Sequence, residues 1–197
     1  MKMKRTLSML LALALGASMS VSAFATSAGQ DTETTIPVRI SAAATTFDVT
    51  VPTSFPTDVD PDTGETTDAT DAKITNNSSG SIVVSQIKVT KYGAWSLADY
   101  DADLRNADVD SNQIGIAVRP VGGRNAGEGG TQLKTTAANA NEQTLLAAAN
   151  DQWVIDAKND GDTDELTISY DTKVSPVSAA LTNEQVASIV VTISWNK

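Results

Sequence analysis

Short runs in which apolar and polar residues alternate recur along this chain, and they constrain its fold more than any other feature. The clearest run is 81–90, which reads Ser-Ile-Val-Val-Ser-Gln-Ile-Lys-Val-Thr and is rich in β-branched residues. β-Branched side chains fit the pleated surface of a half-buried sheet. The run predicts a central strand, and the change of phase at Ser85-Gln86 predicts a bulge in it. Its inward side chains are expected to be Ile82, Val84, Ile87 and Val89.

Similar runs lie before and after this strand and are separated by residues typical of turns. Further strands are expected at 36–41, 47–51, 73–75, 114–119, 153–155, 166–170 and 189–195. Pro37 makes the first of these an edge or terminal strand, because proline lacks the backbone N–H that an inner strand needs. The acidic stretch 57–71 is expected to be a loop or hairpin, and the glycine-rich stretch 121–130 a flexible loop.

Helical signals are few in this sequence. Asn139 with Glu142, and Thr182 with Gln185, have the spacing of a capping box, which predicts short helices at 139–149 and 182–187. Many short strands with turn signals between them are typical of an antiparallel sandwich or barrel. We therefore predict an all-β fold, an antiparallel β-sandwich with one or two short helices in its connections.

The first 25 residues have the pattern of a secretory signal peptide. Lys2, Lys4 and Arg5 precede an apolar run, and Ala23-Phe24-Ala25 matches the small-x-small pattern before a cleavage site. The run is shorter than the ~20 apolar residues that span a bilayer. We expect a signal peptide at 1–25 and a single β-sandwich domain at 26–197, in a secreted protein with no membrane segment after cleavage.

Composition excludes several classes of function. The signal peptide holds three of the 14 basic residues and none of the 24 acidic ones, which leaves the mature chain a net charge of −13. Such a surface disfavours direct binding to nucleic acid or anionic lipid. The chain has no histidine and no cysteine, which removes Ser-His-Asp and Cys-His catalysis and the commonest transition-metal ligand. We expect no enzyme, no cofactor and no metal.

Two acidic runs invite comparison with calcium loops. Asp58, Asp60 and Asp62 alternate before Gly64, and a second run covers 160–164. An EF-hand loop needs glycine at its sixth position and a bidentate glutamate at its twelfth, where the first run has Thr63 and Ala69. Solvated acidic turns are the preferred interpretation of both runs.

The three tryptophans are the candidate binding residues, together with Leu97. Trp153 and Trp195 lie on expected strands, and Trp95 follows one. Aromatic rings on a sheet either stack on apolar sugar faces or are core, because each ring removes about 150–250 Å² from water on burial. The core interpretation is preferred for Trp95 and Trp195, and for Trp153 both interpretations stay open.

The triplet Trp95-Ser96-Leu97 resembles that of the WxL surface proteins of Gram-positive bacteria. The segment Thr46–Pro52 resembles the strand-then-proline opening of that domain, the Asn76-Asn77-Ser78 turn precedes the strand that leads to Trp95, and Trp195 ends the last strand. The resemblance spans roughly 35–197, and Asn196-Lys197 stand where a second leucine would be expected. It implies a β-sandwich that binds the cell wall non-covalently, with other surface proteins as partners.

An export signal joined to a β-sandwich without a catalytic set predicts a secreted, non-catalytic protein of the bacterial cell surface or cell wall. Its expected partners are a cell-wall polymer or other surface proteins. Two alternatives stay open. The first is a subunit of a surface filament, in which the strand 36–41 self-assembles onto a neighbour's open sheet edge. The second is a carbohydrate-binding module that uses exposed rings at Trp95 or Trp153.

Overall fold

The structure is a computed structural model, and it describes residues 44–60, 65–68, 72–127 and 129–197. Ala43–Lys197 form one compact unit, and all the elements below belong to it. The expected strand 36–41 and the predicted signal peptide lie outside the described residues.

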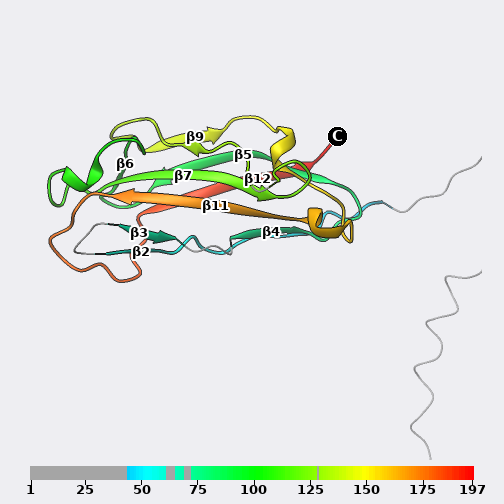
Figure 1. Cartoon of the computed structure of the whole chain (residues 1–197), viewed down its shortest axis with the longest axis horizontal. Helices are drawn as coiled ribbons and strands as arrows, with labels where there is room; N and C mark the ends of the chain where they lie inside the picture. Colours follow the sequence, from blue (N-terminus) through cyan, green and yellow to red (C-terminus); the bar gives the residue numbers. More distant parts are fainter. Residues whose placement is uncertain (1–43, 61–64, 69–71, 128) are drawn as a thin grey trace, which may run out of the picture. The chain divides into compact units, whose positions relative to one another are not determined.

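The described residues form strands and three short 3-10 helices, without an α-helix (Figure 1). The strands are β1 (Val49–Thr50), β2 (Thr57–Val59), β3 (Thr66–Asp68), β4 (Lys73–Asn76), β5 (Ile82–Lys91), β6 (Ser96–Leu97), β7 (Gln113–Gly122), β8 (Leu133–Lys134), β9 (Glu142–Leu146), β10 (Val154–Ile155), β11 (Glu165–Val174) and β12 (Ala187–Trp195). The 3-10 helices are η1 (Leu104–Asn106), η2 (Asp151–Trp153) and η3 (Gly161–Asp164).

Two sheets supply the strands of the core. The larger sheet has the order β1-β4-β11-β7-β6, with β8 also beside β7. The second has the order β10-β5-β12, with β9 also beside β5, while β2 and β3 form a separate hairpin. The pairs are antiparallel except that of β6 with β7. The sheets do not close into a barrel, so the predicted all-β, antiparallel sandwich is confirmed.

The central strand has the face and the bulge that its pattern predicts. Its four expected inward side chains are fully buried. In the ladder between β5 and β12, Gln86 pairs with Thr192 and Val84 pairs with Ile193, which leaves Ser85 as the extra residue. The Ser85 hydroxyl donates to the carbonyl of Thr192 at 3.2 Å. The predicted bulge is therefore confirmed.

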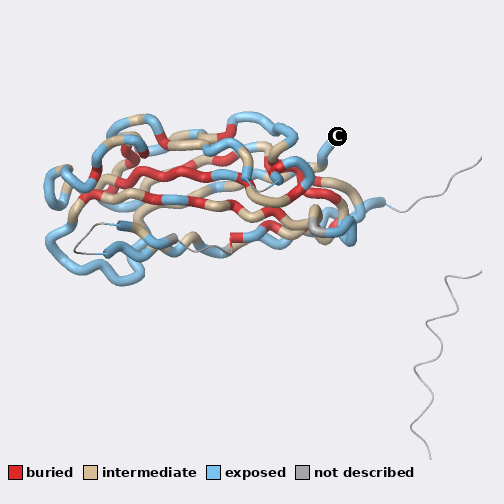
Figure 2. The backbone as a smooth tube through the Cα atoms, viewed as in Figure 1, coloured by how far each residue is buried: buried red, intermediate tan, exposed pale blue. Residues whose placement is uncertain are grey.

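The core is built from alternating side chains of the long strands. β11 shows the alternation most clearly, with Leu166, Ile168 and Tyr170 buried and the residues between them more exposed. Figure 2 shows the same distribution, with buried stretches along the long strands and exposed backbone in the connecting loops. The acidic stretch 57–71 is a hairpin as far as it is described, since Thr57 pairs with Asp68.

Both expected helices are wrong. Glu142–Leu146 is strand β9, which pairs with β5, and 182–187 has no helix before β12 begins. Asn139 and Asn183 have φ values of +56° and +51°, and such left-handed residues end or interrupt a helix rather than start one. The capping-box spacing is a local signal, and pairing with the open side of β5 overrides it at β9.

Gly115 is required by a close approach of two backbones. A Cβ atom on this residue would lie 2.8 Å from the Cα of Tyr100. Gly115→Ala should therefore lower the free energy of unfolding by about 1–3 kcal/mol, measured by urea denaturation. Gly129→Ala is the matched control, because its Cβ would meet the Arg119 side chain at an ordinary 3.5 Å. Equal midpoints for the two variants would contradict the crowding at Gly115.

Candidate functional site

The structure separates the four predicted binding residues into two groups. Trp95, Leu97 and Trp153 are buried in the core, with 4%, 0% and 1% of their surface exposed. Trp95 and Leu97 alternate with the more exposed Ser96, so both apolar members of the triplet turn inward. Trp195 is only half-buried, at the end of β12. Of the four, Trp195 is the residue that a partner can reach in this structure.

β12 is the outer strand of its sheet and pairs with β5 on one side. Even-numbered residues direct their backbone groups towards the β5 side. The carbonyl of Val186 accepts from the Tyr92 N–H, the carbonyl of Thr192 accepts from Ser85, and the Asn196 N–H donates to Ser81. Because backbone groups alternate along a strand, the odd-numbered residues direct theirs to the open side. These residues are Ala187, Ile189, Val191, Ile193 and Trp195.

The apolar row of β12 is incompletely covered. Ile189, Val191, Ile193 and Trp195 are half-buried and pack against the core, whereas the inward residues of β5 are fully buried. On the opposite face, Val190 is 47% exposed. The nine residues of β12 include no charge and no proline. Among the residues that the structure describes, the strand thus combines a backbone edge without a neighbouring strand and apolar side chains that another strand would cover.

An aromatic corner, made of Phe47 and Trp195, stands at the end of this edge. The two rings are perpendicular, with centroids 5.1 Å apart. They line an open hollow of about 540 Å³ together with Ile193, Ser194 and Lys197. The indole also lies close over Gly80, where a Cβ would approach it to 3.1 Å. Phe47 itself is 45% exposed, so the corner is an apolar surface at the solvent.

The polar turn before β5 positions this corner. The Ser78 hydroxyl accepts from the Asp48 N–H at 2.8 Å and donates to the Asp48 carbonyl at 3.0 Å. The Asn77 N–H donates to the same carbonyl at 2.9 Å. Asn76 is fully buried and holds the turn itself, because its amide donates to the carbonyls of Gly80 and Asp156 and accepts from the Ser78 N–H. The segment next to Phe47 is therefore held by three hydrogen bonds to the backbone N–H and carbonyl of Asp48.

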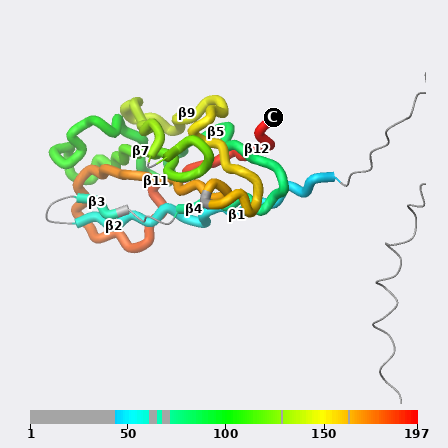
Figure 3. Tube along the Cα trace, turned by 45° about the vertical axis from the view of Figure 1, so that its right-hand side comes forward, coloured from blue at the N-terminus to red at the C-terminus, as the bar shows by residue number. Residues whose placement is uncertain are grey.

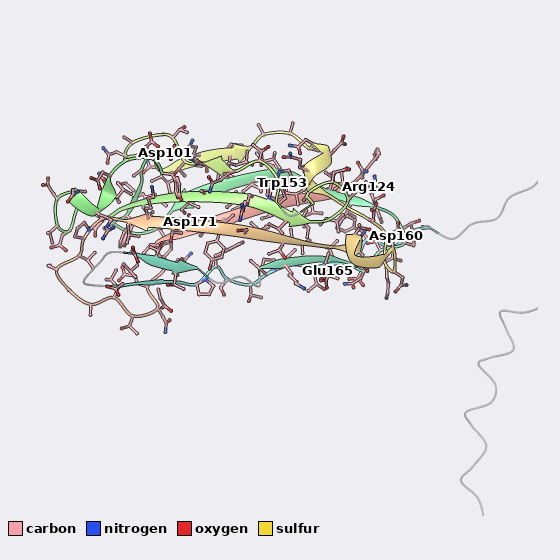
Figure 4. All side chains as sticks on the ribbon, viewed as in Figure 1. Asp101, Arg124, Trp153, Asp160, Glu165 and Asp171 are labelled. Carbon is pink, nitrogen blue, oxygen red and sulfur yellow. The ribbon has the colours of Figure 1, made fainter. Side chains whose placement is uncertain are left out.

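A charged pair, Arg124 and Asp156, lies at the same end of the unit. Arg124, labelled in Figure 4, donates from Nε to Oδ1 of Asp156 at 2.6 Å, and its Nη2 contacts the same carboxylate. This hydrogen bond raises the pKa of the Arg124 guanidinium above its ordinary value. Nη2 also donates to the Ser81 hydroxyl at 3.2 Å, so the pair connects the start of β5 to the end of β10. Its role is to position strands.

The acidic side chains do not gather into a site in the part of the chain that the structure describes. Figure 4 shows Asp160 far along the unit from Asp101 and Asp171. Among the described residues, three or more acidic side chains nowhere converge as metal ligands. The tip of the hairpin with Asp62 lies outside those residues. Asp110 has a lowered pKa because the Ser178 hydroxyl and N–H donate to it, which is a loop contact.

The sequence did not identify β12 as an edge strand or Phe47 as the ring that contacts Trp195. The alternation of 189–195 predicts a strand, but the same pattern fits an inner strand and an edge strand alike. Phe47 was expected on the strand 47–51, but β1 covers only Val49–Thr50, and the structure places Phe47 before it at the surface against Trp195. The absence of charge and proline from β12 is common to inner strands as well.

Comparisons with known proteins give no relative for this chain. It matches no family model, no curated protein and no solved structure. Within the described residues, no helix has the length and apolar character to cross a membrane. The fold and the β12 edge therefore carry the functional argument.

Asn76 should be the residue on which the aromatic corner depends. Asn76→Ala leaves buried backbone partners at Ser78, Gly80 and Asp156 without their hydrogen bonds, each at a cost of ~1–3 kcal/mol. We expect unfolding free energy to fall by at least about 2 kcal/mol in urea denaturation followed by tryptophan fluorescence.

Asn77→Ala is the control for this prediction. The Asn77 side chain makes an exposed hydrogen bond to the Thr50 hydroxyl, and its backbone contact to Asp48 would remain. Its loss should stay within about 0.5 kcal/mol, as for most surface substitutions. A similar loss in both variants would show that the buried amide of Asn76 has no special role.

Proposed function

We propose that this chain is an exported, non-catalytic protein of the bacterial surface, which binds the cell wall or other surface proteins through the open edge of β12. The predicted signal peptide supports export. The single observation that carries the binding role is the long edge strand, with its unpaired backbone groups and half-buried apolar row. Sheet edges of this kind bind extended segments by adding a strand.

Burial of the indoles favours protein contact over sugar recognition. A carbohydrate-binding module would present flat exposed rings, yet Trp95 and Trp153 have almost no exposed surface. Trp195 is half-buried and has Phe47 perpendicular to it, so the pair does not form a flat platform. The aromatic corner resembles an anchor for apolar side chains more than a stacking surface for a sugar ring.

The chemistry of the chain supports a role without catalysis. General acid–base chemistry would need titratable groups with shifted pKa values in a common cleft. Lys73 and Asp110 have shifted pKa values because of one neighbour each, Glu165 and Ser178, and the pKa of Arg124 is raised mainly by its hydrogen bond to Asp156, with smaller effects of Asp160 and Asp151. The hollow at the aromatic corner is lined by no carboxylate, and its one charged residue is Lys197.

The filament alternative is favoured by the same edge. A subunit that assembles by strand addition needs an acceptor edge and a donor segment, and β12 supplies an edge of nine residues. The wall-binding and filament roles use this edge differently: the first fills it with a foreign partner and the second with another copy of the chain.

Binding to washed bacterial cells tests the proposed function. The mature chain should stay with the cells on sedimentation, and Val191→Pro should lose most of this retention. Proline at 191 removes an N–H that points to the open side, so the ladder with β5 stays intact. Val190→Lys is the control, because its side chain is exposed on the opposite face.

Treatment of the cells identifies the class of partner. Retention that is lost after the cells are digested with protease indicates surface proteins, whereas retention by purified peptidoglycan indicates the wall polymer. Wild-type protein that stays wholly in the supernatant with both preparations would overturn the proposed function.

A further inference from the structure

We infer that the occupant of the β12 edge is the segment 36–41 of a second copy of this chain, so that copies assemble head to tail. This inference rests on the proposed function, because both use the same edge, and it names the partner. The segment reads Ile-Pro-Val-Arg-Ile-Ser, with Ile36, Val38 and Ile40 on one face of an extended strand. That face matches the half-buried row of β12 in period and in chemistry.

Proline in the donor fixes which of its backbone groups meet β12. Successive residues of a strand direct their backbone groups to opposite sides. If Ile36, Val38 and Ile40 direct theirs to β12, Pro37 directs its nitrogen away from the ladder, where the missing N–H has no consequence. The odd-numbered residues of β12 present the complementary groups on the open side.

The donor lies close in sequence to the aromatic corner. Residues 42–46 separate it from Phe47, which contacts Trp195 at the end of β12. The described chain begins at residue 44, and β1 lies at the same end of the unit as the end of β12 (Figure 3). A copy whose edge is filled presents its own donor at that end, which permits the next addition.

Geometry favours the second copy over the segment's own copy. Residues 42–46 extend to roughly 17 Å at about 3.4 Å per residue, and β12 is about 30 Å long. From Phe47, the segment reaches its own edge most directly in the direction parallel to β12. The other pairs of this sheet are antiparallel, and a parallel pair is slightly less stable per residue. The donor of another copy is free to add in the antiparallel direction.

Head-to-tail addition does not close on itself when the donor and the acceptor are different surfaces. Each copy then has one free donor and one free edge, and the product is a linear filament. The surface filament expected as an alternative from the sequence thus has a defined acceptor strand, β12. It also has a defined register, in which the nitrogen of Pro37 faces away from the ladder.

Complementation between two single variants tests this inference. Ile40→Pro removes a donor N–H that meets β12, and Val191→Pro removes an N–H of the edge. Both are made in the full mature chain, and circular dichroism and thermal melting check that both fold. Size-exclusion chromatography with light scattering should show wild-type mass rising with concentration, while each variant alone stays a monomer.

Mixing the two variants gives the decisive measurement. The Val191→Pro chain keeps its donor and the Ile40→Pro chain keeps its edge, so the mixture should form a one-to-one dimer and nothing larger. Ser41→Pro is the matched donor control, because its N–H points away from β12, and it should assemble like the wild type. Its failure to assemble would contradict the register.

Two other outcomes would overturn the inference, and only the second would also contradict the proposed function. A wild-type monomer at every concentration would exclude the second copy. A lower melting temperature of Ile40→Pro with no dimer in the mixture would assign the segment to its own copy. In the first case the loss of cell retention by Val191→Pro would still support a foreign partner at the edge, whereas in the second the edge is already filled by its own chain.

Discussion

The ladder between β5 and β12 is the interaction on which the rest of this structure depends. β5 pairs with every other strand of its sheet, with β9 and β10 on one side and β12 on the other, and its inward side chains are fully buried. Because both sides of β5 are occupied, the unpaired hydrogen-bonding groups of the sheet fall on its outer strands. Those on β9 and β10 are few, since these strands are short, and β12 has the long free edge.

The alternation of apolar and polar residues predicted the long strands, because one face of each sheet is buried and the other is more exposed. β5, β7, β11 and β12 were expected from alternation, and the phase change at Ser85-Gln86 marked the bulge. The stretch 139–149 was misread because capping-box spacing describes what a segment does alone. Strand β9 forms there because β5 offers it backbone partners, which are distant in sequence and leave no local signal.

The candidate site was less predictable than the fold, for a related reason. An aromatic residue type indicates a large apolar surface, but whether that surface is covered depends on strand order. Trp95 and Trp153 are buried in the core and Trp195 falls at an edge, and Trp153 lies in η2 rather than on the strand expected at 153–155. Phe47 was expected in a strand but lies before β1, and its contact with Trp195 joins the first and the last segments of the described chain.

The composition of β12 is that of an edge strand that stays able to pair with another strand. Proteins protect free edges by making them short, by placing charge or proline on them, or by covering them. β1, β6 and β8 are protected by being two residues long, and β9 has Glu142 at its start. β12 is nine residues long, with no charge and no proline, and the bulge in its ladder lies on β5. The net charge of −10 favours general repulsion between copies. Such repulsion limits non-specific association between copies. The β12 edge stays available for a segment whose backbone can pair with it, and such pairing is selective without a binding pocket.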